Sequence, residues 1–142
     1  MALRVYTGTI YNYRNIPDGL NISVKSAPED GQAFIPTWDM VLGYKEGRIR
    51  EEEYVIQYRE KMLRSQFNSP EKWAKLLARP RVTLLCYCHP AEFCHRYLLA
   101  AMLVNMGAQY MGEAELTTEG IMINKSTLDI VDFWAKYFKD RS

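Results

Sequence analysis

The stretch that decides the fold lies between residues 82 and 87 and reads VTLLCY, a nearly continuous apolar run with a proline near each end. Such a run is typical of a central strand that is buried on both faces of a sheet. The segment Cys94–Met106 follows it with leucines and methionines on one helical stripe, and Gly107 is placed to end the helix. This unit predicts a strand that leads directly into a helix.

Strand and helix patterns alternate on both sides of this unit. The β-rich segments 3–11 and 20–24 predict two more strands, and residues 108–123 favour one or two short strands around Tyr110 and residues 121–123. Capping residues and apolar spacing indicate helices over 36–45, 51–66 and 126–137, and a short one beginning at Ser69. Residues 12–19 and 26–31 are expected to be irregular. We therefore expect an α/β fold: a single three-layer domain over residues 1–142, with a mainly parallel sheet of about four to five strands flanked by helices.

Composition and charge fit an ordinary globular protein. The chain has 142 residues, of which 48% are hydrophobic and 25% charged. Its 18 basic and 17 acidic residues give a net charge of +1, which argues against an extended nucleic-acid surface. The three cysteines are odd in number and close together, which argues against a secreted disulfide scaffold and predicts a reducing, cytoplasmic setting. No signal peptide is expected at the N-terminus, and the longest apolar run, Leu98–Val104, is too short to span a membrane.

All three cysteines and both histidines lie in one segment, between Cys86 and Arg96. This segment begins where the predicted central strand ends, and it ends where the next helix begins. In open α/β sheets, ligands bind at this end of the strands. The N-terminus of the helix adds free N–H groups and a partial positive charge, which suit a phosphate or a carboxylate. The sequence therefore predicts a binding or catalytic site at residues 86–96.

Cys94 and His95 are the predicted catalytic residues. A cysteine at the start of a helix and next to Arg96 has a lowered thiol pKa, and His89 or His95 would be its acid–base partner. The alternatives are that Cys94 is a small packed side chain and that His95 is a core histidine bonded to backbone. Arg96 stands where the helix dipole disfavours a cation, so a bound anion, a buried carboxylate such as Glu113, or solvent must offset its charge.

A zinc site is the competing interpretation of the same segment. Its spacing lacks the paired gaps of about two to four residues that are common in structural zinc sites, so no cofactor is predicted and zinc is kept as a lesser alternative. The phosphatase-type loop is absent, because no arginine stands six positions after Cys86 or Cys88. If a metal is bound, the side chains able to hold it are Cys86, Cys88, His89, Cys94 and His95.

Several blocks of the sequence follow a pattern shared with known proteins. Leu84–Tyr87 and then Phe93–Ala100 form a leucine-leucine-cysteine run followed by a C-terminal Cys-His-Arg motif, and Tyr6-Thr7 and Gly112-Glu113 fit the same pattern. A further block precedes the cysteine strand and consists of Phe34, Pro36, Trp38, Val41, Tyr44, Lys45, Gly47, Ile49, Tyr54, Tyr58 and Leu63. Over most of its length the chain therefore resembles domain-of-unknown-function family 488 (DUF488), small proteins of bacteria, archaea and their phages.

The resemblance implies an α/β fold but no activity, since the family's name records that none is established. One position departs from the pattern: relatives usually carry an acidic residue where this chain has Cys88, which weakens a zinc site built on it. Cys86, Cys94, His95 and Arg96 remain as the shared set. The remaining residues of the implied pocket wall are Tyr6, Thr7, Lys25, Ser26, Trp38, Tyr44, Lys45 and Glu113. For Trp38 and Tyr44, ordinary helix packing is an equally good explanation.

These observations favour one function and leave two alternatives open. We expect the segment 86–96 to bind a small phosphorylated or nucleotide-like anion, with Arg96 and aromatic side chains as its contacts. The first alternative is a transferase or hydrolase that uses Cys94 and a histidine on a nucleotide-like metabolite. The second is a zinc-stabilised interaction module. No membrane partner is expected, and a homo-oligomer stays open.

Overall fold

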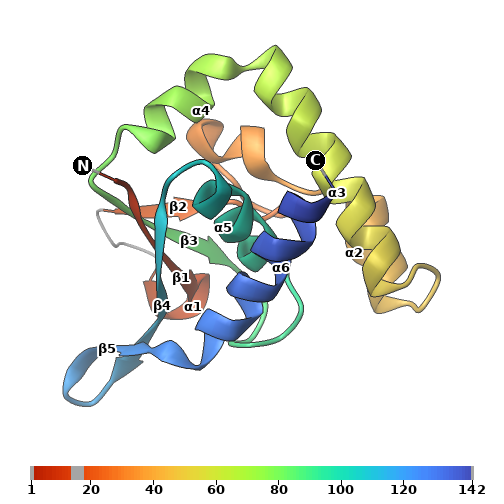
Figure 1. Ribbon diagram of the computed structural model, residues 1–142. Helices are drawn as coiled ribbons and strands as arrows, with labels where there is room; N and C mark the ends of the chain where they lie inside the picture. The colour runs from red at the N-terminus through yellow and green to blue at the C-terminus, as the bar shows by residue number, and fades with distance from the viewer. Residues whose placement is uncertain (1, 14–17, 142) are drawn as a thin grey trace.

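A five-stranded sheet forms the centre of the protein in the computed structural model, which describes residues 2–13 and 18–141 (Figure 1). The strand order is β2-β3-β1-β4-β5. The first four strands are parallel, and β5 runs antiparallel to β4. The mainly parallel sheet predicted from the sequence is confirmed. The strands are β1 (Arg4–Thr9), β2 (Gly19–Asn21), β3 (Arg81–Cys86), β4 (Gln109–Thr117) and β5 (Gly120–Asn124).

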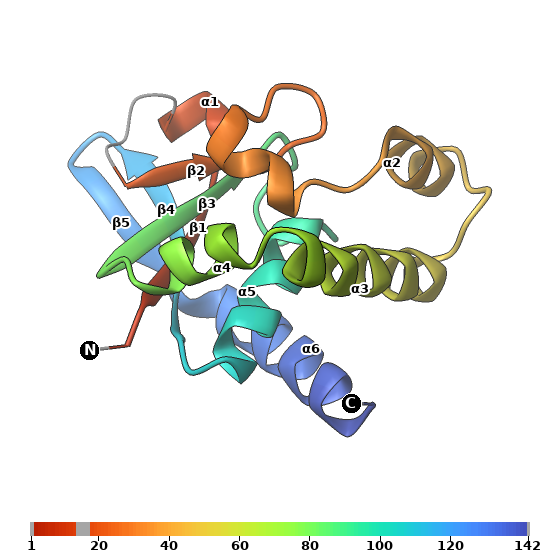
Figure 2. The ribbon, with the colours of Figure 1, turned by 90° about the horizontal axis from the view of Figure 1, so that it is seen from above.

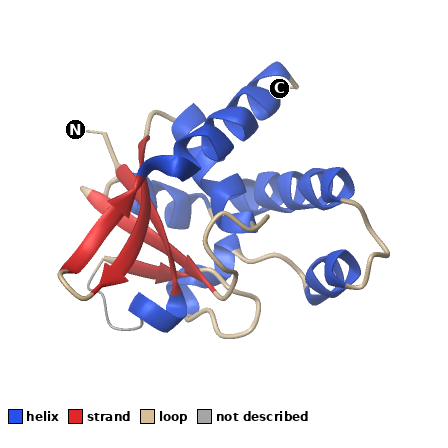
Figure 3. Ribbon diagram, turned by 90° about the horizontal axis from the view of Figure 1, so that it is seen from below, coloured by secondary structure: helices blue, strands red, loops and turns tan. Residues whose placement is uncertain are grey.

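Helices cover the two faces of the sheet unequally. The short α1 lies on one face, and α4, α5 and α6 lie on the other, with α3 beyond them (Figure 2). Figure 3 shows the strands gathered on one side of the molecule and the longer helices on the other. The helices are α1 (Ile10–Tyr13), α2 (Trp38–Lys45), α3 (Glu51–Asn68), α4 (Pro70–Leu77), α5 (His95–Asn105) and α6 (Leu128–Asp140), with 3-10 turns at Glu29–Phe34 and Lys125–Thr127.

The helix α5 occupies the middle of the main core. Every residue from His95 to Leu103 is buried, so this helix has no solvent-facing side over its first two turns. The sheet contributes Val5, Val82 and Leu84 to the same core, and α3 and α6 close it from outside. Because α5 is enclosed, any polar group near its start has to find partners inside the protein.

The carboxyl ends of the parallel strands meet at one edge of the sheet. Thr9, at the end of β1, pairs with Cys86, at the end of β3. The chain leaves β1 through α1 on one face and leaves β3 towards α5 on the other face (Figure 2). Diverging connections at the carboxyl ends of parallel strands are the usual place for a ligand site in α/β proteins.

The structure differs from the predicted elements in three places. The first strand ends at Thr9 and is followed by α1, and residues 14–17 of the predicted irregular stretch lie outside the described residues. The second strand is limited to Gly19–Asn21, because the Asn21 side chain accepts the N–H of Ser23 and turns the chain. The region 108–123 contains a longer hairpin than expected, β4–β5. None of the helices in the described residues combines the length and the apolar character needed to cross a bilayer.

Candidate functional site

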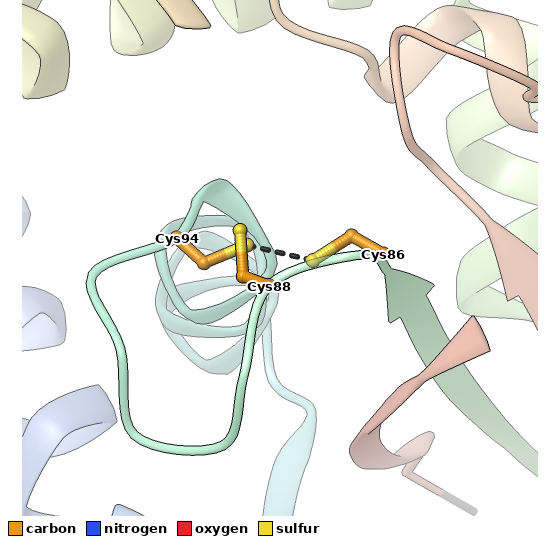
Figure 4. A group of neighbouring side chains, drawn as sticks. All are labelled: Cys86, Cys88 and Cys94. Carbon is orange, nitrogen blue, oxygen red and sulfur yellow. Dashed lines mark hydrogen bonds between the residues drawn. The ribbon is translucent and has the colours of Figure 1, made fainter. Parts of the chain in front are cut away.

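Three cysteine side chains converge at the carboxyl end of β3. Cys86 is the last residue of β3, Cys88 lies in the loop that follows, and Cys94 is the N-cap residue of α5. The Sγ atoms of Cys86 and Cys94 are 2.7 Å apart, and all three Sγ atoms lie within 4.8 Å of one another (Figure 4). All three are free cysteines. The loop 87–93 therefore brings the start of α5 back to the end of the strand.

The Cys94 thiol is placed to ionise. Burial disfavours its charged form, but hydrogen bonds from Cys86 and Cys88 and the positive charge of Arg96 outweigh burial and hold the pKa of Cys94 well below its usual value. Burial raises the pKa of Cys86, and hydrogen bonding to Cys86 raises the pKa of Cys88. These directions favour a thiolate on Cys94 over one on Cys86 or Cys88.

His95 is held in one tautomer beside Cys94. Its Nε2 lies 2.7 Å from the carbonyl oxygen of Ile22, and because a carbonyl only accepts, Nε2 carries the hydrogen. Burial lowers the pKa of His95, which favours the neutral ring. The unprotonated Nδ1 then faces Cys94 Sγ at 3.7 Å, and the ring packs against Tyr58. Of the two histidines considered as partners for Cys94, the structure brings His95 to it, whereas His89 is exposed.

Arg96 is enclosed and bonded to protein groups. Its Nη1 donates to Cys86 Sγ at 2.8 Å and to the carbonyl of Cys88 at 3.2 Å, and its Nη2 donates to the carbonyl of His89 at 3.0 Å. Nη2 also forms an ion pair with Glu113 at 3.3 Å, with both side chains 0% exposed. Of the three ways to offset the charge of Arg96, the buried carboxylate is the one seen, and solvent is excluded. Nε of Arg96 is buried without a hydrogen-bond partner in the described residues.

A chain of hydroxyl groups orients Glu113. Thr7 donates to Glu113 Oε1 at 2.6 Å, and since this uses its only hydroxyl hydrogen, Tyr110, 2.6 Å from Thr7, is the donor to it. Burial raises the pKa of Tyr110 to about 12, so this phenol keeps its proton. Gly112 has φ +131°, and an added Cβ there would lie 2.8 Å from the Asn124 carbonyl oxygen, so glycine is needed for β5 to pair closely beside Glu113.

The predicted pocket wall divides between the buried network and the surface. Thr7 and Glu113 belong to the network around Arg96. Ser26 bonds to the Tyr87 hydroxyl at 2.8 Å, and Lys25 lies over the Tyr87 ring, so these three form a surface cluster beside the loop.

The other predicted wall residues make different contacts. Tyr44 packs on Phe93 with ring centroids 4.9 Å apart, which agrees with the packing explanation for that residue. Trp38 and Lys45 are exposed on α2, and Tyr6 lies beneath Arg81. The role of these residues in ligand binding stays a prediction.

Three groups at the site were missed from the sequence. The Tyr97 hydroxyl accepts from the N–H of Ala91, accepts from Arg96 and donates to Glu113, so it ties the loop to the ion pair. Tyr97 follows the Cys-His-Arg motif directly, and that position was the available signal. Phe93 packs among Tyr44, Tyr54 and Trp134. The Ile22 carbonyl is a backbone group and leaves no mark in the sequence.

Among the residues that the structure describes, the sulfur atoms of Cys86, Cys88 and Cys94 are the group best suited to bind a soft metal ion. His89 and His95 do not join this group. The guanidinium that donates to Cys86 puts a permanent positive charge beside the sulfurs, which works against a cation. Zinc stays the lesser alternative, as in the sequence analysis.

Comparisons with known proteins identify a family. The family DUF488-N3a, described as the active DUF488-N3 subclade, matches residues 9–107, well over half of the chain. Comparisons with curated proteins and with solved structures found no match. The matched range runs from the end of β1 through the cysteine strand and the whole of α5. The resemblance read from the Cys-His-Arg block is thus confirmed, and the chain belongs to the DUF488-N3a family.

Proposed function

We propose that this protein is a cysteine-dependent enzyme with the Cys94 thiolate as its nucleophile and His95 as its proton carrier. One observation carries the proposal: His95 Nδ1 faces Cys94 Sγ at 3.7 Å while Nε2 is tied to the Ile22 carbonyl. A nucleophile, a base and a group that orients the base form the arrangement on which thiol enzymes depend.

The reaction this arrangement supports is transfer or hydrolysis through a covalent thiol intermediate. Sγ of Cys94 forms a bond to an electrophilic carbon or phosphorus of the substrate, and the bond from that atom to the leaving group breaks with its electron pair. Because Cys94 attacks as a thiolate, the leaving group takes its proton from solvent, and Nδ1 of His95 accepts the proton of the water or second substrate that attacks next and returns it to solvent. Water or a second substrate attacks the intermediate and releases the Cys94 thiolate.

The setting of Cys94 supports this reading in two further ways. The residue stands at the carboxyl end of the parallel sheet and at the N-terminus of an 11-residue helix, where a negative charge is favoured. The matching subclade is also described as active. A thiolate of this kind needs a reducing compartment, in keeping with the cytoplasmic setting expected from the sequence.

Access to Cys94 runs through the loop 87–93. The Cys94 side chain is only 3% exposed, while His89, Pro90, Ala91 and Glu92 in the loop are exposed. Ala91 has φ +64°, in the left-handed region that non-glycine residues rarely adopt, so this loop is held in a strained form. We infer that substrate displaces the loop to reach the sulfur.

Alkylation by iodoacetamide tests the nucleophile without a known substrate. Peptide mass spectrometry would follow each cysteine from about pH 5 to about pH 9. We expect Cys94 to react at least about tenfold faster than Cys88 at neutral pH, because only thiolate attacks. Cys88→Ser, the matched control, should leave the Cys94 rate within a factor of about two. Slow labelling of Cys94 that rises with pH like an ordinary thiol would reject the proposal.

A second variant tests the role of His95. His95→Asn should still be labelled quickly at Cys94, because Cys86, Cys88 and Arg96 hold the thiolate without His95. With p-nitrophenyl acetate as a model acyl donor, this variant should accumulate acylated Cys94, detected by mass spectrometry, because the attacking water has lost its base. If His95 only supports the fold, acylated Cys94 will not accumulate beyond its level in the original protein.

A second candidate function is binding of a small phosphorylated or nucleotide-like anion, and one observation favours it. Arg96 Nε is buried without a partner beside the N-terminus of α5, and such a group calls for a bound water or anion. Lys25, Ser26 and Tyr87 would supply a cation, a hydroxyl and a stacking ring at the adjacent surface.

Thermal shift with inorganic phosphate, AMP and ATP tests this binding. Stabilisation should be lost in Lys25→Ala if the surface cluster takes part, and in Arg96→Lys if the guanidinium does, with Lys45→Ala as a control on the remote α2. Unchanged melting of the original protein across the panel would reject it. Elemental analysis of protein purified without added metal decides the zinc alternative.

A further inference from the structure

We propose that Cys86 is the resolving cysteine for Cys94, so that hydrogen peroxide converts the pair into an intramolecular disulfide that switches the site off. This inference rests on the proposed function, because it concerns the regulation of the same sulfur. It assigns a separate role to Cys86, which does not face substrate in the proposed reaction.

The geometry of the two sulfurs supports this pairing. Their Sγ atoms are 2.7 Å apart, compared with about 2.05 Å in a disulfide, so a small side-chain adjustment suffices to join them. Cys86 is fixed at the end of β3, paired with Thr9 of the central strand, and Cys94 is fixed at the start of the enclosed α5. The two thiols therefore face each other from rigid elements.

The third cysteine is poorly suited to either role. Cys88 lies in the loop and is half-buried, which makes it the most exposed of the three. The 2.7 Å sulfur contact of Cys94 is with Cys86, which stands at the end of a strand, whereas Cys88 stands in a loop. The disulfide should therefore form between Cys94 and Cys86 and leave Cys88 as a free thiol.

Hydrogen peroxide is the two-electron oxidant, and the disulfide forms in two steps. The Cys94 thiolate attacks one oxygen of hydrogen peroxide, the O–O bond breaks, and hydroxide leaves and takes a proton to become water. Cys94 is then a sulfenic acid, oxidised by two electrons. The Cys86 sulfur attacks that sulfur, its own proton passes to the departing hydroxyl, and the S–S bond forms with release of a second water.

Arg96 connects this chemistry to the rest of the site. Its Nη1 donates to Cys86 Sγ at 2.8 Å, and this contact stabilises the negative charge that develops on Cys86 as it loses its proton. In the disulfide neither sulfur is charged, so Cys94 can no longer act as a nucleophile. A dithiol such as dithiothreitol restores both thiols and the activity.

Peroxide oxidation followed by peptide mapping under non-reducing conditions tests the proposal. After brief treatment with hydrogen peroxide, we expect a Cys86–Cys94 cross-link and a fall of at least about tenfold in iodoacetamide labelling of Cys94, reversed by dithiothreitol. In Cys86→Ser the cross-link is absent, and dimedone should trap the sulfenic acid on Cys94. Cys88→Ser, the matched control, keeps a hydrogen-bond donor beside Cys94 and should form the cross-link as fast as the original protein.

Two outcomes overturn the proposal and are distinguishable from failure of the enzyme hypothesis. A cross-link that mainly involves Cys88, or accumulation of sulfinic acid on Cys94 in the original protein, contradicts the role of Cys86 while fast alkylation of Cys94 still supports the nucleophile. Slow alkylation in the untreated protein contradicts the proposed function itself.

Discussion

The start of α5 and the loop 87–92 are close in sequence but differ in burial. Residues 94–97 are buried and joined to β2, β3 and β4 or their flanking segments by hydrogen bonds to Ile22, Cys86 and Glu113. In the loop, the side chains of His89, Pro90, Ala91 and Glu92 are exposed. The contrast teaches that the groups of the candidate site are fixed by the core, whereas the loop, through which we propose that substrate reaches them, is exposed.

The largest expected effect on stability comes from Glu113→Ala, which changes the buried network at the start of α5. The change leaves the enclosed guanidinium of Arg96 without its ion-pair partner, which should cost about 3–5 kcal/mol of unfolding free energy in urea denaturation. Asp132→Ala, which removes the partner of an exposed ion pair with Lys136, is the control and should leave that free energy nearly unchanged. Equal losses in the two variants would show that the network at the start of α5 does not stabilise the fold.

A smaller loss is expected for Gly112→Ala, next to Glu113. The added methyl group would contact the Asn124 carbonyl, and alanine rarely adopts the positive φ of this position. We expect the unfolding free energy, measured by urea denaturation, to fall by about 2 kcal/mol. Gly120→Ala is the matched control, since Gly120 also has a positive φ, +114°, but faces open space. The difference between the two losses of unfolding free energy measures how much the close approach of β5 to Gly112 costs an added methyl group. A larger loss in Gly120→Ala than in Gly112→Ala would contradict this explanation.

The smallest of the three stability effects concerns Tyr97, which joins the two regions. Tyr97→Phe removes the hydroxyl that binds the Ala91 N–H, Arg96 and Glu113, for an expected loss of about 1–2 kcal/mol. Because the loop then loses its tie to the ion pair, limited proteolysis should cut it faster, and peptide mapping would locate the cut. Proteolysis at an unchanged rate would show that Tyr97 does not hold the loop.

The sequence allowed the buried unit to be predicted well and its connections poorly. The strand at residues 82–87 and the helix after Cys94 were predicted correctly. Burial on both faces of a sheet leaves a continuous apolar run, and burial of a helix leaves apolar side chains at helical spacing. The second strand was placed too long, because side-chain hydrogen bonds of Asn21 turn the chain at Ser23. Neither an apolar run nor the spacing of apolar residues indicates a turn of this kind.

The candidate site was predicted as a set of residues but not as an arrangement. The clustering of cysteines, histidines and Arg96 pointed to residues 86–96, and Glu113 was named among the partners for Arg96, which the ion pair confirms. The enclosure of Arg96 depends on the packing of α5 on all sides, which only the assembled fold shows. The choice of His95 over His89 depends on a backbone carbonyl 73 positions away, at Ile22.

The most direct test of the central claim is the titration of the Cys94 thiolate itself, by the difference in ultraviolet thiolate absorbance between the original protein and Cys94→Ser. Because hydrogen bonds from Cys86 and Cys88 and the charge of Arg96 lower the pKa of Cys94 despite its burial, the difference should already be at its full size at neutral pH and should vanish only on acidification. A difference that appears only near pH 9.0, the usual value for a cysteine thiol, would contradict the claim.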